Sequence, residues 1–152
     1  MSIWWSLHLR REAASVPLAR RLLLGTMETA GVDPEISYDL SVALSEACAN
    51  AVEHGGGQGF GEASAAYRVT AYLDGETCRI EVADSGPGFP IRHGGCAPAL
   101  PQAAPTDESG RGLCLIEQLA DHVHFRNRPG HGAVVSFDKI LKWREDALLR
   151  VS

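Results

Sequence analysis

The sequence predicts a two-layer α/β sandwich in which helices cover one face of a mixed, mostly antiparallel sheet. Short segments alternate apolar and polar residues with the period of β-strands, and two longer segments carry apolar stripes with the period of α-helices. Several of the strands follow one another across short turns, as in hairpins. Hairpins with helices between them favour helices that pack on one side of a single sheet.

Two helices follow the first predicted strand, residues 2–10. Residues 11–30 carry an apolar stripe that indicates a helix, which ends where Gly31 follows the last turn. The second helix begins at Asp33-Pro34-Glu35, which supplies a capping side chain, a proline at the first helical position and an acid in the first turn. We expect it to end near His54, because the glycine-rich residues 55–61 do not continue a helix.

The second half of the chain predicts four strands, a long loop and two short helices. Residues 67–73 and 78–83 alternate and are joined by Asp74-Gly75-Glu76-Thr77, which indicates a hairpin. Residues 85–110 hold five prolines and five glycines and form one long loop, a feature that is usually functional. The remaining elements are a helix over 113–120, strands over 123–127 and 133–137, and a short terminal helix over 139–152.

Length, composition and charge exclude several classes of protein. The 152 residues form one domain, residues 1–152, with 45% hydrophobic and 22% charged residues, which excludes wholesale disorder, collagen and coiled coil. The net charge of −5, with no basic run, argues against nucleic-acid binding. The chain shows no membrane segment and no signal peptide. Its four cysteines form no Cys-x-x-Cys motif, and Cys48 and Cys114 have the apolar neighbours of reduced core thiols, so we expect a cytoplasmic protein.

The second helix carries a polar stripe. Glu46, Asn50 and His54 follow one another at four-residue spacing, so they lie on nearly one line of the helix. The neighbouring positions are small or apolar, and a buried carboxylate or amide is costly without a partner. A carboxylate beside an amide oxygen suits Mg²⁺, which prefers hard oxygen ligands. A solvated helix edge, with His54 complementing the helix dipole, explains these three residues equally well.

Two glycine motifs lie at the ends of the long loop. Asp84 ends an apolar strand and opens Asp84-Ser85-Gly86-Pro87-Gly88-Phe89, where a carboxylate can accept from a ligand amino group and two glycines let a flat ring approach the backbone. The second motif, Ser109-Gly110-Arg111-Gly112-Leu113, precedes a helix and offers backbone N–H groups and a cation to a phosphate. An ordinary glycine turn and a plain helix boundary are the alternative explanations.

Common nucleotide and hydrolase motifs are absent from the sequence. Neither lysine lies in a Walker A loop, and the glycine run 55–61 follows a helix instead of opening one, so it is no dinucleotide fingerprint. No Gly-x-Ser-x-Gly or His-Glu-x-x-His motif is present either.

Taken in order, the three motifs form a composite pattern over nearly the whole chain. It resembles the Bergerat-type ATP-binding domain shared by gyrase, the heat-shock chaperone ATPases, sensor histidine kinases and mismatch-repair ATPases. The segment from Leu44 to Gly55, Leu-Ser-Glu-Ala-Cys-Ala-Asn-Ala-Val-Glu-His-Gly, is similar to the stand-alone branch, the anti-sigma-factor serine/threonine kinases.

The resemblance implies an ATP- and Mg²⁺-dependent kinase. Glu46 would act as the general base on the partner's hydroxyl or on water, and Asn50 would bind Mg²⁺ through its amide oxygen. Asp84 would accept a hydrogen bond from the adenine amino group, and residues 89–109 would form the lid. The implied nucleotide-binding residues are Asn50, His54, Asp84, Gly86, Gly88, Gly110, Arg111, Gly112 and Leu113. The role of His54 stays open.

The resemblance also implies the partners. The protein would phosphorylate a serine of an anti-sigma-factor antagonist and bind a sigma factor. The resemblance also makes a homodimer plausible. One departure is Ala133, where the family often has a threonine beside the adenine. The alternative hypothesis is a non-catalytic, ATP-gated protein-binding switch, against which the intact Glu46 argues. A small α/β protein that binds no nucleotide would need three coincident motifs in the right order.

Overall fold

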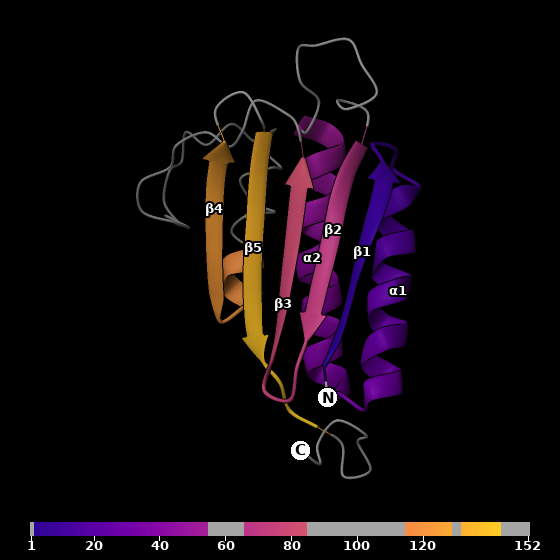
Figure 1. The fold of residues 1–152 in the computed structure, drawn as a ribbon, viewed down its shortest axis with the longest axis vertical. Coiled ribbons are helices and arrows are strands. Elements are labelled where there is room, and N and C mark those ends of the chain that lie inside the picture. The colour runs from indigo at the N-terminus through magenta and orange to yellow at the C-terminus, as the bar shows by residue number, and fades with distance from the viewer. Residues whose placement is uncertain (1, 55–65, 85–114, 129–131, 144–152) are drawn as a thin grey trace.

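The computed structural model describes residues 2–54, 66–84, 115–128 and 132–143. Figure 1 shows the strands and helices in chain order. Their bounds are β1 Ile3–Arg10, α1 Ser15–Ala30, α2 Pro34–His54, β2 Ala66–Leu73, β3 Thr77–Asp84, β4 His122–Arg128 and β5 Gly132–Ile140. Residues 115–119 add a short helical segment between β3 and β4.

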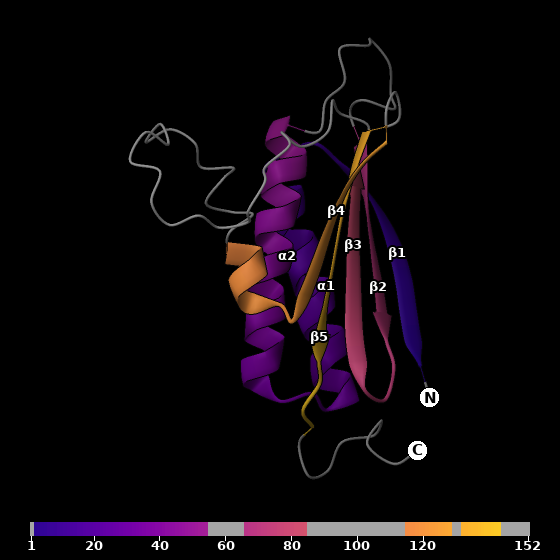
Figure 2. The same ribbon diagram turned by 90° about the vertical axis from the view of Figure 1, so that its left-hand side faces the viewer.

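The strands form one sheet in the order β1-β2-β3-β5-β4, and all four ladders between them are antiparallel. Both α1 and α2 lie on one face of this sheet, as Figure 2 shows edge-on, and the segment 115–119 lies on the same side. The two-layer α/β sandwich is therefore confirmed, and the described strands contain no parallel pair. No described helix is both long and apolar enough to cross a membrane.

The core lies between the sheet and the helices. In β3, Cys78, Ile80 and Val82 are buried, and the alternation of a strand therefore turns these residues toward the helices. Leu40 and Leu44 of α2 are fully buried in the same cluster. Phe137 of β5 is 1% exposed and lies opposite Ile80, so it joins the strand pair to the helix layer.

We expect Phe137→Ala to lower the free energy of unfolding by about 3–5 kcal/mol, because it removes a large side chain from a packed core. Ile140→Ala, on the same strand but 61% exposed, should change it by no more than about 0.5 kcal/mol. Urea denaturation of both variants measures this difference. Equal losses in the two variants would show that Phe137 is not a core residue.

The first helix begins later than the sequence predicts. Residues 11–14 are not helical, and α1 starts at Ser15 instead of at residue 11. A turn precedes it, in which the Ser15 N–H donates to the Glu12 carbonyl at 2.9 Å. The predicted end is confirmed: Gly31 has a φ of 90°, and its N–H donates to the Met27 carbonyl at 3.0 Å. A positive φ of this size explains why glycine stands there.

The start of α2 is confirmed in detail. The Asp33 carboxylate accepts a hydrogen bond from the Glu35 N–H at 2.8 Å, as a capping side chain does. Pro34 is the first helical residue, where its missing N–H costs nothing. The predicted end at His54 is also confirmed.

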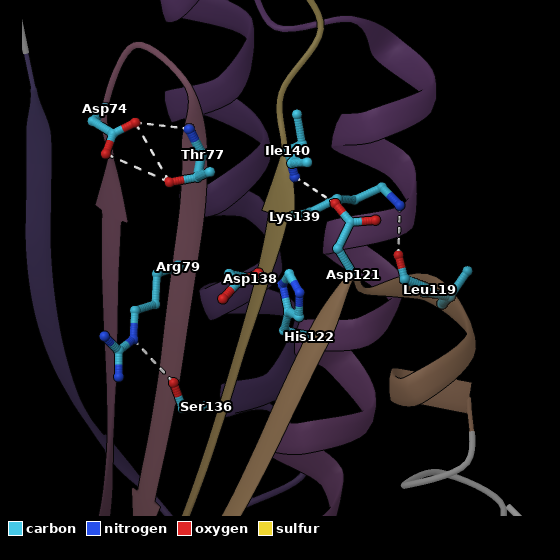
Figure 3. A network of polar contacts seen from close by, with 10 residues as sticks. All are labelled: Asp74, Thr77, Arg79, Leu119, Asp121, His122, Ser136, Asp138, Lys139 and Ile140. Atoms are coloured by element: carbon cyan, nitrogen blue, oxygen red, sulfur yellow. Dashed lines mark hydrogen bonds and ion pairs between the residues drawn. The ribbon is translucent and has the colours of Figure 1, made fainter.

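The hairpin between β2 and β3 is confirmed too, and Figure 3 shows its turn. The Asp74 carboxylate accepts hydrogen bonds from the N–H groups of Glu76 and Thr77, both at 2.7 Å. The bond from Thr77, followed by that from Glu76, lowers the pKa of Asp74 below its usual value. This side chain therefore explains why four residues suffice to reverse the chain.

The predicted terminal helix over 139–152 is wrong for its described part. Lys139 and Ile140 continue β5, which extends beyond the predicted strand 133–137. Trp143 then pairs with Val32 in an antiparallel bridge, and its indole N–H donates to the Gly75 carbonyl at 3.2 Å. These tertiary contacts hold residues 141–143 in an extended conformation, and the periodicity of the sequence does not predict them. Residues 144–152 lie outside the described part of the chain.

The described helices leave the other face of the sheet uncovered. Trp4, 65% exposed, stacks there on Tyr72, 46% exposed, with 6.1 Å between the ring centroids. Trp5, the next residue of β1, points to the helix side, where its indole N–H donates to the Thr26 hydroxyl at 3.1 Å.

Candidate functional site

The polar stripe of α2 is only partly solvated. Asn50 is 7% exposed, whereas Glu46, one turn earlier, is half-buried. The Asn50 amide nitrogen Nδ2 is buried and has no hydrogen-bond partner within the described ranges. A buried amide without a partner costs about 1–3 kcal/mol, so the structure favours a ligand at this position over a solvated helix edge. His54 is the last residue of α2.

Asp84 lies at the end of β3 with its side chain on the helix side of the sheet. It continues the alternation of Ile80 and Val82, which are buried on that side, and it is half-buried itself. Its register partner on β2 is Tyr67, which is 2% exposed and therefore belongs to the same layer. Its carboxylate accepts a hydrogen bond from the Ala133 N–H at 3.3 Å.

This contact makes Ala133, the position at which the resemblance implies a threonine, a neighbour of Asp84. Ala133 is 2% exposed and brings no hydroxyl to this position.

The fold brings the two halves of the site to one end of the molecule. Figure 1 shows the C-terminal ends of α2 and β3 at the same end of the sandwich, where β5 begins. Asn50 belongs to the last two turns of α2, and Asp84 is the last residue of β3. A buried amide and a half-buried carboxylate, far apart in sequence, are thus presented at one edge of the helix layer.

A chain of neutral polar side chains links α1, β2 and α2. The Ser15 hydroxyl donates to the Glu12 carbonyl at 2.7 Å and is 2.6 Å from the Tyr67 hydroxyl. Since the serine proton is used, Tyr67 donates to Ser15, and Tyr67 in turn is hydrogen-bonded to Cys48 of α2. Burial raises the pKa of Cys48 to about 12 and that of Tyr67 well above its usual value. Both groups therefore stay protonated at neutral pH, and Cys48 is the buried thiol that the sequence predicts.

The helical segment 115–119 is held by a side chain of β5, the strand next to the edge strand β4. Lys139 donates to the Leu119 carbonyl at 2.7 Å, a contact drawn in Figure 3, and lies 3.9 Å from the Asp39 carboxylate of α2. Ile116 is fully buried. The predicted helix over 113–120 is thus confirmed in its described part, and the chain enters this segment directly from the second glycine motif.

The remaining predicted site residues lie outside the described part of the chain. They are Gly86, Gly88, Gly110, Arg111, Gly112 and Leu113, together with the predicted lid, residues 89–109. The structure thus describes Glu46, Asn50, His54 and Asp84 of the predicted set, and it places the ends of α2 and β3, which carry Asn50 and Asp84, at the same end of the molecule.

Sequence reasoning missed two residues that support this site. Arg11 donates to two carbonyls at the end of α2, and Lys139 holds the segment 115–119. Neither belongs to a motif, and both act through backbone carbonyls, so only the tertiary structure shows them. A half-buried arginine directly after a strand looks in the sequence like any solvated cation.

The fold and the site are those of a class of ATP-binding domain, and comparisons with known proteins identify the family. The profile of the histidine kinase-like ATPase domain matches residues 9–139. The chain belongs to this family. It is 34% identical over 131 residues to the serine-protein kinase RsbW of Bacillus licheniformis, an alignment that covers 83% of this chain and 78% of the relative. The resemblance to the anti-sigma-factor serine/threonine kinases is thereby confirmed.

Further relatives are named either as serine-protein kinases or as anti-sigma factors. The chain is 32% identical over 120 residues to the serine-protein kinase RsbW of Bacillus subtilis strain 168, covering 76% of this chain and 72% of the relative. It is 30% identical over 117 residues to the anti-sigma F factor of Pasteuria penetrans, covering 74% of this chain and 75% of the relative.

A solved structure confirms the fold. The crystal structure of the RsbU and RsbW domains of Rv1364c from Mycobacterium tuberculosis superposes with a TM-score of 0.66 at 20% identity, over 93% of this chain. The chain spans 33% of the length of that protein.

Proposed function

We propose that this protein is an ATP- and Mg²⁺-dependent serine/threonine kinase that acts as an anti-sigma regulatory factor. The observation that carries the proposal is the buried Asn50 Nδ2, which has no hydrogen-bond partner among the described residues and lies one turn from Glu46, at the same end of the fold as the end of β3 that carries Asp84. The names of the relatives support the reaction class.

The residues present fit magnesium and a nucleotide. Asn50 offers an amide oxygen, a hard ligand of the kind that Mg²⁺ accepts beside phosphates and water. Its Nδ2, which no described residue contacts by a hydrogen bond, adds a donor that a phosphate oxygen can satisfy. Bound there, magnesium would offset the negative charge of the phosphates during transfer. Among the described residues, no cluster of three His, Cys, Asp or Glu side chains provides a separate metal site.

The proposed mechanism assigns one task to each described residue. Asp84 accepts from the adenine amino group and fixes the base, while Asn50 holds the phosphate end. Glu46 takes the hydroxyl proton of the acceptor serine while the serine oxygen bonds to the γ-phosphorus of ATP. The bond between the γ-phosphorus and the β–γ bridging oxygen breaks at the same time, which releases ADP. Gly86, Gly88, Gly110, Arg111, Gly112 and Leu113 complete the proposed nucleotide site, with His54 included but without an assigned role.

The proposed partners follow the names of the relatives. The acceptor serine belongs to an anti-sigma-factor antagonist, and the protein binds a sigma factor in the cytoplasm. The proposal includes self-association into a homodimer, which sedimentation velocity of the wild type would detect. The alternative function is an ATP-gated switch without catalysis. Ala133 leaves it open, because alanine lacks the hydroxyl of the threonine that the resemblance implies at this position, whereas the intact Glu46 argues against it.

Calorimetric titration of ATP with and without Mg²⁺ tests the nucleotide site. We expect the wild type to bind ATP more tightly with Mg²⁺, and Asn50→Ala to lose about tenfold or more in that affinity, because a polar contact to a charged group contributes about 1.5–3 kcal/mol. Glu35→Gln, an exposed position in the first turn of the same helix, is the matched control and should bind as the wild type does.

Two results would contradict this expectation. An unchanged magnesium effect in Asn50→Ala would remove Asn50 from the metal site. No ATP binding by the wild type at millimolar nucleotide would leave only the fold and would indicate a protein-binding relative of the family.

A further inference from the structure

The end of α2 is held by a residue from another part of the chain. Arg11 lies directly after β1, and its guanidinium donates twice to α2: Nε to the Ala51 carbonyl at 3.0 Å and Nη2 to the Val52 carbonyl at 2.6 Å. The side chain is half-buried, so these contacts are shielded from water on one side.

The two carbonyls that Arg11 contacts lie in the last turn of the described helix. Ala51 and Val52 are among the last four residues of Pro34–His54, whose carbonyls no N–H group of that range can reach in the α-helical pattern. A cation at this end also complements the helix dipole. The sequence continues with the glycine-rich residues 55–61, which favour no helical conformation. Arg11 therefore fixes the backbone immediately beside Asn50.

The segment that carries Arg11 is also tied to the other half of the site. Four residues on, Ser15 is bonded to the Glu12 carbonyl and to the Tyr67 hydroxyl. Tyr67 is the register partner of Asp84. The turn 11–15 thus contacts both the end of α2, which carries Asn50, and the strand beside Asp84.

We propose that Arg11 is a positioning residue for nucleotide binding: it holds the Asn50 end of α2 in place relative to Asp84. The inference rests on the proposed function. The planar guanidinium suits this task because it binds two adjacent carbonyls at once, whereas a lysine ammonium is a single point charge. Loss of the two hydrogen bonds from Arg11 to α2 would displace the phosphate end of the site and leave the adenine end intact.

The test compares Arg11→Met, Arg11→Lys and the control Arg10→Met, which removes the neighbouring exposed arginine. Calorimetry measures the affinity of each variant for Mg²⁺-ATP and for adenosine, which has no phosphates. We expect Arg11→Met to bind Mg²⁺-ATP about 10- to 100-fold more weakly, since small misplacements of a site have effects of this size. Its adenosine affinity should stay within about twofold, which is well under 1.4 kcal/mol. Arg11→Lys should be intermediate, and Arg10→Met should equal the wild type.

The outcomes separate the possible failures. Equal losses for both ligands, or no loss for either, would overturn the positioning role. If Arg11→Met does not fold, Arg11→Lys alone decides, since it must still weaken Mg²⁺-ATP more than adenosine. If the wild type itself shows no magnesium-dependent ATP binding, the proposed function fails and the inference falls with it.

Discussion

Glu46→Gln is expected to reduce phosphate transfer to the antagonist about 100- to 10,000-fold, the usual contribution of a general base. The substitution keeps the size of the side chain and removes its ability to accept a proton. Glu46 is half-buried one turn before Asn50, so the change leaves the proposed nucleotide contacts in place. Transfer of labelled γ-phosphate to the purified antagonist measures the rate, and calorimetry should show Mg²⁺-ATP affinity within about threefold of the wild type, less than 1.4 kcal/mol.

Glu35→Gln is the control for this experiment, because it makes the same chemical change on the exposed first turn of α2. It should transfer phosphate at the wild-type rate. A Glu46→Gln variant that transfers phosphate normally would exclude Glu46 as the base. A wild type that binds ATP and never transfers phosphate would instead establish the ATP-gated switch.

The sequence predicts the fold because local signals and tertiary structure agree over most of the chain. Asp33 caps α2 and Gly31 ends α1 through contacts within a few residues, so the local sequence is enough to predict these two helix boundaries. The two largest differences, at the start of α1 and in the segment after residue 138, coincide with contacts between residues far apart in the sequence. Residue 11 stays outside α1 because Arg11 reaches α2, and Lys142 leaves the predicted terminal helix because its carbonyl accepts from the Asp33 N–H at 2.8 Å.

The sequence also predicts which residues belong to the candidate site, but not how the rest of the fold surrounds them. Helical spacing places Glu46 and Asn50 one turn apart, and strand alternation places Asp84 at a strand end, so motif and period suffice for these residues. The periodicity does not reveal that Asn50 is buried, or that its Nδ2 has no hydrogen-bond partner in the part of the chain that the structure describes, since burial depends on what the rest of the fold packs against α2. The supporting contacts of Arg11 and Lys139 join elements far apart in sequence and are found only in the structure.

Asp84→Asn should lower the affinity for ATP about 10- to 100-fold, the effect of losing a hydrogen bond to a charged acceptor. The Asp84 carboxylate lies on the helix side of the sheet, where it accepts from the Ala133 N–H. An asparagine replaces one acceptor oxygen by a donor, which opposes the adenine donor or the Ala133 N–H. Because a site built to pair a specific group rejects ligands that lack it, the wild type should also prefer ATP to GTP. Calorimetric titration with each nucleotide measures both effects.

Glu81→Gln provides the matched control on the same strand. Glu81 lies three residues before Asp84, on the opposite face of the sheet by strand alternation, where it pairs with Arg79 at 3.2 Å. This variant should bind ATP within about twofold of the wild type, since an exposed ion pair contributes about 0–1 kcal/mol to stability and has no contact with the helix-side layer. If Asp84→Asn binds ATP as tightly as Glu81→Gln does, the adenine is recognised elsewhere. If only Asp84→Asn loses affinity, the helix-side end of β3 is the base-binding half of the site.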